Sequence, residues 1–296
     1  MSSFDDIFQS PAEPPRNQTF DKDAWAAKKQ AERKQLYDLA DSTAVGISQG
    51  GDKFRDYLDV QSRFGRYSVT NALLILAQKP QATQVKSFED WQKADVSIKR
   101  YQKHFTILEP GKEYDREDGT KGTSYEPKQV FDISQTTARV KTPPETQRDD
   151  RAILKALIHK PPVPIQTVEE LPNNAGAMYD HSQGVIFVRK GMTAPDIFRN
   201  VSMEIARAEL AADSPSYDRS ATSFPAYCVS YMLCKRNGID VSGYSFDRLP
   251  ESIRSGDPQT IREELTRVRD TASNISGRMA RALNPERQTK PRGQER

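Results

Sequence analysis

An amphipathic segment between Thr193 and Leu210 places the strongest constraint on how this chain can fold. Thr193-Ala194-Pro195-Asp196 forms a capping box with proline in the first turn, which is typical of a helix N-terminus. One apolar stripe follows at helical spacing, made by Ile197, Val201, Ile205 and Ala208. A second stripe consists of Met203, Ala206 and Leu210. The segment therefore predicts a helix that begins near residue 194.

A β-hairpin is predicted directly before this helix. Two short apolar runs, Ala177–Tyr179 and Val185–Val188, flank the polar turn Asp180–Gly184, which ends in glycine. Further helices are predicted from about Phe224 to Lys235 and from Pro258 onward. In the last of these the apolar residues in register are Ile261, Leu265, Val268 and Ala272.

The predicted helix after the hairpin carries only part of a zinc-binding motif. In H-E-x-x-H, two histidines on one helix face bind Zn²⁺, and the glutamate acts as general base on the metal-bound water. Residues 203–207 instead read Met203-Glu204-Ile205-Ala206-Arg207. A thioether is a weak donor and a guanidinium has no lone pair to offer, so neither Met203 nor Arg207 replaces a neutral histidine. We therefore expect no zinc, no other cofactor and no catalysis here.

Glu204 is the part of the motif that remains. Without a metal to lower the pKa of its water, a general base has little to activate. The alternatives are an ion pair with a nearby cation such as Arg207 or Arg199, or an exposed carboxylate. His159 and His181 lie away from the helix pattern, and we expect them to be loop or surface residues rather than ligands.

The composition limits the classes of protein to which the chain can belong. Its 296 residues suffice for two domains, and 35% apolar against 29% charged residues suggests that the ends stay solvated. The net charge of +3 requires any nucleic-acid binding to come from a local basic face. No apolar run approaches the roughly 18 residues of a membrane span, and the acidic N-terminus is unlike a secretory signal. We expect a cytoplasmic protein without a membrane partner, in which Cys228 and Cys234 are reduced, packed thiols.

The first half is predicted to contain three helices. One covers about residues 22–41, and the second runs from Ser68 through Leu76 until Pro80 stops it. A short third helix surrounds Trp91.

Strands are predicted after these helices, so the fold class is α+β. Two alternating runs, Val96–Tyr101 and His104–Leu108, are typical of a strand pair, and another strand is expected at Val130–Ile133. Glycines among charged residues in Gly111–Tyr125 indicate a long hairpin loop.

Polar segments divide the chain into two predicted domains. The expected parts are a disordered tail at 1–20, a mixed helix and antiparallel-sheet domain at 21–137, a linker at 138–150, a second domain at 151–273, and a basic, mobile tail at 274–296.

Several blocks of the first domain resemble one known family. Arg63–Ile75, Gln78–Thr83, and then Phe88 and Trp91 are similar in order and spacing to the N-terminal domain of ArdC-type antirestriction proteins. Phe131–Thr136 matches the closing strand of that domain. The resemblance covers about residues 50–137, and it implies binding of single-stranded DNA by this domain, followed by a zinc-metallopeptidase-like domain.

The second half resembles that peptidase domain, which is related to the ImmA/IrrE group. The family's third zinc ligand is usually a glutamate on the next helix, and Tyr227 stands at that position. Cys234–Asp240 and Tyr244-Ser245 continue the family pattern, which supports the register. The resemblance thus implies a zincin-like fold without zinc ligands. We refer to its Met203, Glu204, Arg207 and Tyr227 as the vestigial site.

A single strand needs cations for its phosphates and exposed aromatic rings for its bases. The first domain offers both kinds of residue. The candidate contacts are Arg63, Phe64, Arg66, Tyr67, Asn71, Lys86, Trp91, Lys99, Arg100, Tyr101, Lys103 and Gln135. The expected strand pair would place Lys99 and Tyr101 on one face and Arg100 on the other.

A second interpretation of these residues is purely structural. Phe64, Tyr67 and Trp91 would then be core residues, and the cations an ordinary solvated surface. Asn71 equally suits local backbone capping, and Gln135 has the same ambiguity. His104 either contacts phosphate or faces solvent.

Two hypotheses for function follow. The first is a mobile-element protein that binds single-stranded DNA without sequence preference, with a role in antirestriction or DNA transfer and an inactive peptidase-like second domain. The alternative is an interaction protein in which the vestigial site docks a protein partner and DNA contact is incidental.

Overall fold

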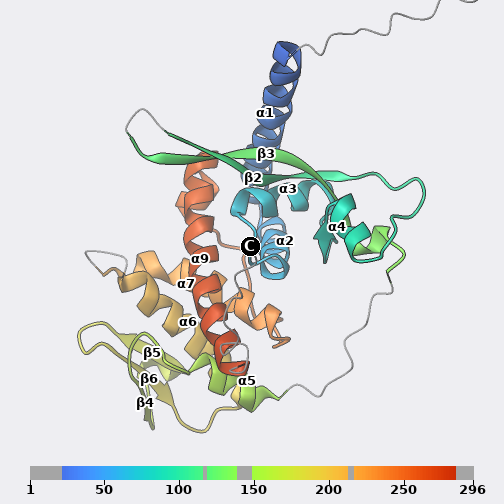
Figure 1. Cartoon of the computed structure of the whole chain (residues 1–296). Helices are drawn as coiled ribbons and strands as arrows, with labels where there is room; N and C mark the ends of the chain where they lie inside the picture. Colours follow the sequence, from blue (N-terminus) through green and yellow to red (C-terminus); the bar gives the residue numbers. More distant parts are fainter. Residues whose placement is uncertain (1–21, 116–118, 139–148, 213–216, 285–296) are drawn as a thin grey trace, which may run out of the picture.

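The computed structural model describes residues 22–115, 119–138, 149–212 and 217–284 (Figure 1). The expected tail at 1–20, most of the linker and the end of the basic tail lie outside these ranges. The fold is mixed α+β, as predicted, with two small sheets among the helices. The helices of the first half are α1 (Lys22–Ile47), α2 (Gly51–Arg63), α3 (Val69–Gln78) and α4 (Phe88–Lys93).

Helix α1 confirms the first predicted helix and extends beyond it. Its buried residues Leu36, Ala40, Ala44 and Ile47 continue one stripe at helical spacing past the expected end at residue 41. Helix α2 was not predicted, although Phe54, Tyr57, Leu58 and Gln61 are buried with the same spacing. Helix α3 begins as expected, because the Ser68 hydroxyl caps the backbone N–H of Asn71 at 3.2 Å.

The first sheet has the antiparallel order β1-β3-β2, with β1 at Val85–Lys86, β2 at Phe105–Asp115 and β3 at Lys121–Asp132. The prediction of a long loop at Gly111–Tyr125 was therefore wrong for most of that segment, which pairs as the outer half of the β2–β3 hairpin. Gly122 does not form a turn. It lies opposite Tyr114, whose ring packs over the position that a Cβ atom on Gly122 would take.

The prediction of a strand at Val96–Tyr101 was also wrong. Only an isolated bridge between Ile98 and Thr136 remains, and the segment then enters a turn in which Tyr101 has φ 63°. The cause is the neighbouring segment η2 (Ile133–Gln135), which coils into a 3₁₀ helix and offers no extended partner. Lys99 and Tyr101 are thus not related by strand alternation.

The Asp132 carboxylate holds this corner of the fold together. One of its oxygens accepts the backbone N–H groups of Thr83 (2.7 Å) and Gln84 (3.0 Å), and the other accepts that of Ser134 (2.9 Å). The Gln135 side chain in turn accepts the Asp132 N–H at 2.9 Å, which completes a reciprocal capping box. Asp132 therefore ties the segment before β1 to the end of β3.

The second half contains the other sheet and the helices that cover it. The sheet order is β4-β6-β5, and the antiparallel pair β5 (Ala177–Asp180) and β6 (Val185–Arg189) confirms the predicted hairpin. Strand β4 (Ile165–Val168) pairs parallel to β6 and was not expected. The remaining elements are α5 (Asp150–Leu157), η3 (Pro172–Asn174), α6 (Ala194–Ala212), α7 (Arg219–Arg236), α8 (Glu251–Arg254) and α9 (Pro258–Leu283).

Helices α7 and α9 are both longer than predicted. Helix α7 begins before Phe224, because the Asp218 carboxylate caps the backbone N–H of Ser220 at 2.8 Å. Helix α9 continues past Asn274, where we expected a mobile basic tail to begin. Ile275 and Met279 are buried there, and apolar burial keeps these turns helical.

The two halves share one contiguous set of buried apolar residues. Phe54 of α2 packs against Phe224 and Phe246, with ring centroids 5.5 and 5.7 Å apart. Asp59 accepts the Tyr231 hydroxyl at 2.6 Å and pairs with Lys235 at 3.0 Å. The boundaries of two domains at 21–137 and 151–273 stay a prediction.

We expect Asp132→Asn to lower the free energy of unfolding by about 2 kcal/mol at pH 7, because an amide nitrogen would face backbone donors. Burial alone would raise the pKa of Asp132, but hydrogen bonds from Ser134, Thr83 and Gln84 outweigh it and hold the pKa below its usual value. The carboxylate's contribution is therefore complete above the unfolded pKa of about 4 and is lost as the pH falls through the folded pKa.

Urea unfolding at pH 7 and at about pH 3 measures this difference between protein and variant, which should shrink at the lower pH. Asp56→Asn, at an exposed position of α2, is the control and should change little. Equal stability of Asp132→Asn and the unchanged protein at pH 7 would contradict the role given to Asp132.

Candidate nucleic-acid interface and the vestigial site

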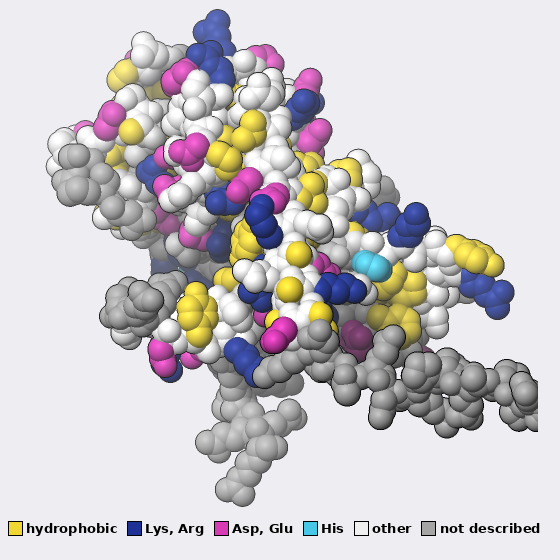
Figure 2. Space-filling view, turned by 90° about the horizontal axis from the view of Figure 1, so that it is seen from above, with side chains coloured by type: hydrophobic (Ala, Val, Ile, Leu, Met, Phe, Trp, Pro, Cys, Tyr) yellow, Lys and Arg dark blue, Asp and Glu magenta, His cyan; other side chains and the backbone are white. Residues whose placement is uncertain are grey.

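An exposed turn carries four of the predicted nucleic-acid contacts. We call Lys99–His104 the Tyr101 turn. The side chains of Lys99, Arg100, Tyr101 and Lys103 are all exposed, and Tyr101 is 98% exposed. A non-glycine residue at φ 63° carries strain of order 1 kcal/mol. Figure 2 shows Lys and Arg side chains around exposed hydrophobic ones at the right-hand end of its view, where the loop before β2 projects in Figure 1.

Hydrogen bonds from η2 hold this turn in place. The Lys99 N–H donates to the Gln135 carbonyl at 2.9 Å, and the Gln135 side chain donates to the Lys103 carbonyl at 2.7 Å. The Lys99 ammonium reaches the Ser134 carbonyl at 3.0 Å. Gln135 itself is buried, so its side chain positions the turn from beneath.

Three other predicted contacts lie in the core. Phe64 is buried, and so is Trp91, whose indole N–H donates to the Phe131 carbonyl at 2.9 Å. Asn71 exchanges two hydrogen bonds with the backbone of Leu108, at 2.7 and 2.8 Å. These rings cannot stack on bases without unfolding, so the structural interpretation fits all three residues.

The remaining predicted residues are partly engaged. Arg63 donates to the Pro80 carbonyl, and Lys86 lies 4.9 Å from the centre of the Trp91 ring. Tyr67 is half-buried with its ring edge-on to Phe64, and burial raises its pKa. Arg66 lies near Arg236 of α7, whose pKa is lowered by burial and then by the Arg66 charge. The structure therefore does not bring the predicted set together at one surface: Arg66 lies beside α7, and Lys86 lies beside Trp91.

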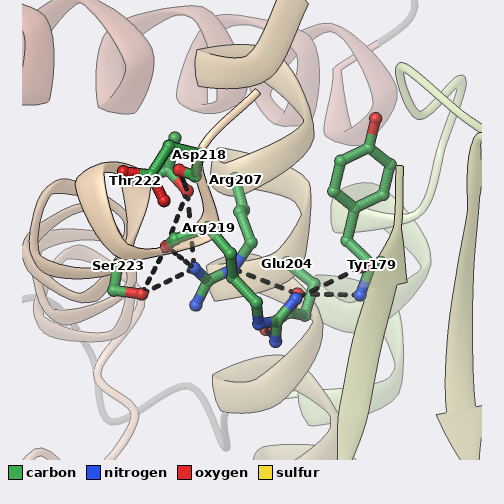
Figure 3. A network of polar contacts seen from close by, with 7 residues as sticks. All are labelled: Tyr179, Glu204, Arg207, Asp218, Arg219, Thr222 and Ser223. Carbon is green, nitrogen blue, oxygen red and sulfur yellow. Dashed lines mark hydrogen bonds and ion pairs between the residues drawn. The ribbon is translucent and has the colours of Figure 1, made fainter. Parts of the chain in front are cut away.

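The vestigial site is organised around a buried carboxylate (Figure 3). Glu204 of α6 is 1% exposed and accepts the backbone N–H of Tyr179 at 2.8 Å. The guanidinium groups of Arg207 and Arg219 lie 3.2 and 3.5 Å from its oxygens. The expected ion pair with Arg207 is confirmed. Arg199 pairs with Asp196 instead, and the alternative of an exposed carboxylate was wrong.

Arg207 links Glu204 to the beginning of α7. Its Nε faces Glu204 as an ion pair without hydrogen-bond alignment, and its NH1 donates to the Arg219 carbonyl at 3.0 Å and the Ser223 hydroxyl at 2.9 Å. The buried guanidinium is therefore matched by a counter-ion from α6 and by hydrogen-bond acceptors from α7.

The same network covers the outer edge of β5. The backbone N–H and carbonyl of Tyr179 both point away from β6. The N–H donates to Glu204, and the carbonyl accepts a hydrogen bond from the Arg219 guanidinium at 3.2 Å. Glu204 and Arg219 thus occupy the backbone positions at which an added strand would pair. The sequence indicated the ion pair but not this contact, because it depends on how α6 and α7 meet β5.

The other two residues of the vestigial site, Met203 and Tyr227, face a cavity of about 350 Å³. The Tyr227 hydroxyl accepts the Ser245 N–H at 2.8 Å. A thioether, a phenol and a guanidinium are poor zinc ligands, and two guanidinium groups already engage the Glu204 carboxylate, so these residues do not fit the metal. Within the described residues no group of three His, Cys, Asp or Glu side chains has metal-site geometry.

The two histidines expected to lie in loops or at the surface are found there, and the two cysteines are packed in the core. His181 lies in the β5–β6 turn, 3.1 Å from the Tyr179 hydroxyl and stacked on Tyr217, and His159 is exposed. Cys228 and Cys234 are free and buried, and burial raises both thiol pKa values. Among the described helices, none has the length and apolarity that a membrane span requires.

Two crystal structures of the antirestriction protein ArdC from plasmid R388 are similar to this chain. The metal-free structure is 16% identical with a TM-score of 0.45, and the Mn(II)-bound structure is 17% identical with a TM-score of 0.47. Each comparison covers 72% of this chain and 85% of the other. These structures belong to the family that the sequence blocks resemble. No family model and no curated protein sequence matches the chain.

We expect Glu204→Gln to lower the free energy of unfolding by about 3 kcal/mol, because it leaves the Arg207 charge buried without its counter-ion. Urea unfolding measures the loss. The double variant Glu204→Met, Arg207→Met should be more stable than Glu204→Gln, since both charges are removed together.

Glu264→Gln is the matched control, because its ion pair with Arg267 is 29% and 45% exposed and should contribute less than about 1 kcal/mol. A Glu204→Gln protein as stable as this control would contradict the structural role of Glu204.

Proposed function

We propose that this chain binds single-stranded DNA without sequence preference and that the Tyr101 turn is its principal contact. One observation carries the proposal: an almost fully exposed tyrosine is held in a strained conformation between cationic side chains. Strain of this kind persists where the surrounding structure imposes it, and it is concentrated at functional sites. Two hydrogen bonds supply that constraint here: the Gln135 side chain donates to the Lys103 carbonyl, and the Ser134 carbonyl accepts the Lys99 ammonium.

The chemistry of the turn suits an unpaired strand. A base stacked on an aromatic side chain contributes about 1–3 kcal/mol, and every base offers a face for stacking. Lys99, Arg100 and Lys103 lie within two residues of Tyr101 and can neutralise neighbouring phosphates, which makes binding sensitive to salt. In a duplex the bases are stacked on each other, so a projecting ring has no free face to meet.

The wider role follows from the resemblance to ArdC-type proteins. We infer a protein of a plasmid, phage or conjugative element that protects incoming single strands from restriction or assists their transfer, acting in the cytoplasm. Its second half would be an inactive peptidase fold, because Met203, Arg207 and Tyr227 replace the metal ligands and Glu204 is engaged by arginines.

A second candidate function is docking of a protein partner at the vestigial site. The cavity of about 350 Å³ beside Met203 and Tyr227 favours it, since a side chain of a partner can enter a hollow of this size. In this case a partner should remain bound in a pull-down after nuclease treatment and be lost in Met203→Arg, which fills the cavity. If nuclease treatment releases every partner, the partners were held through DNA, and this second function is contradicted.

We expect Tyr101→Ala to weaken binding of a labelled single-stranded oligonucleotide about tenfold, measured by fluorescence anisotropy. Lys99→Ala with Lys103→Ala should weaken it further at low salt and reduce the slope of log K against log salt by about 1.4, since about 0.7 is lost per phosphate contact.

Tyr114→Ala is the control, because Tyr114 is 51% exposed but lies on the outer part of the β2–β3 hairpin. If Tyr101→Ala binds with unchanged affinity, the Tyr101 turn is not the principal DNA contact. Equal affinity for duplex and single strand would contradict stacking as the source of binding.

A further inference from the structure

Two adjoining hollows lie beside the first sheet, on the side of the Tyr101 turn. The first, of about 240 Å³, is bounded by α1, α4 and β3. The second, of about 480 Å³, lies along α1 toward its N-terminus. The two share the side chains of Lys29, Glu32 and Gln129.

One contact between aromatic rings joins the Tyr101 turn to the first hollow. His104, the last residue of the turn, has its ring edge-on to that of Phe131, with centroids 6.2 Å apart. Phe131 also lines the hollow, where Phe88 of α4 forms part of the wall. Phe131 therefore lies between the Tyr101 turn and the hollow that Phe88 lines.

Exposed aromatic rings mark both hollows. Phe88 is the first residue of α4 and is 45% exposed, because the Ser87 cap directs the helix so that Trp91, and not Phe88, enters the core. Trp25 of α1 is 51% exposed and lines the second hollow. An exposed ring in a hollow offers a face on which an unpaired base can stack.

The two lysines that line the first hollow are already paired with carboxylates. Lys29 lies 3.4 Å from Glu32, Lys128 lies 3.5 Å from Glu109, and Glu89 adds another carboxylate. Phosphates gain little from cations that are paired in this way. The hollow instead offers the Phe88 ring and the amide of Gln129, which suit the face and the edge of a base.

We propose that a single strand bound at the Tyr101 turn continues along β3 into the first hollow, where Phe88 stacks on a second unpaired base. This inference rests on the proposed function and extends it. The turn supplies the phosphate contacts, and the hollow supplies base contacts that depend little on salt. Binding through Phe88 therefore requires an oligonucleotide long enough to reach it.

The test compares a short oligonucleotide of about 4 nucleotides with a longer one of about 16, spanning the range of single-strand site sizes. Fluorescence anisotropy is measured at low and moderate salt for the full chain and for Phe88→Ala, Tyr101→Ala and Tyr114→Ala. Thermal unfolding of each variant verifies that it is folded.

Phe88→Ala should lose about tenfold in affinity for the longer oligonucleotide, by the same factor at both salt concentrations, and keep its affinity for the shorter one. Tyr101→Ala should lose affinity for both, and Tyr114→Ala for neither. An unchanged affinity of Phe88→Ala for the longer strand, with Tyr101→Ala impaired, overturns the extension alone. If the unchanged protein binds neither oligonucleotide, the proposed function and the extension are both overturned.

Discussion

The Asp132 carboxylate accepts three backbone N–H groups at the end of β3, and the geometry of the candidate interface depends on that interaction. It joins the segment before β1 to η2, and η2 then supports the Tyr101 turn through Gln135. A carboxylate that is 1% exposed is stable only when its oxygens are satisfied, so the three donors and the acid require each other. These hydrogen bonds hold η2, and through η2 the turn that carries the strained, exposed Tyr101.

A second buried carboxylate organises the other half. In H-E-x-x-H chemistry the glutamate acts on a metal-bound water. Here Glu204 lies between Arg207 and Arg219 and bonds the edge strand β5. Because both side chains are buried, each charge depends on the other for its counter-ion. Glu204 and Arg207 together link α6, α7 and β5.

The two halves are linked by packing and by polar contacts. Phe54 enters the aromatic group around Phe246, and Asp59 connects α2 to Tyr231 and Lys235. Helix α2 was missed in the sequence because its apolar residues are interleaved with charges, yet it supplies the first half's side of this contact. Local sequence does not show which of two amphipathic faces will meet another segment of the chain.

The sequence by itself determined the helices α3 and α6, the β5–β6 hairpin, and a cation within reach of Glu204, with Arg207 as one of the candidates. These features depend on caps, apolar spacing and charges a few residues apart, which are local. Only the tertiary structure decided which predicted contacts are exposed. Trp91, Phe64 and Asn71 lie inside, whereas Tyr101 lies outside, although all four suit a nucleic-acid interface equally well by residue type. The strand expected at Val96–Tyr101 became a turn because its neighbour η2 coils, and pairing between segments is settled by the partner and not by the pattern of either segment alone.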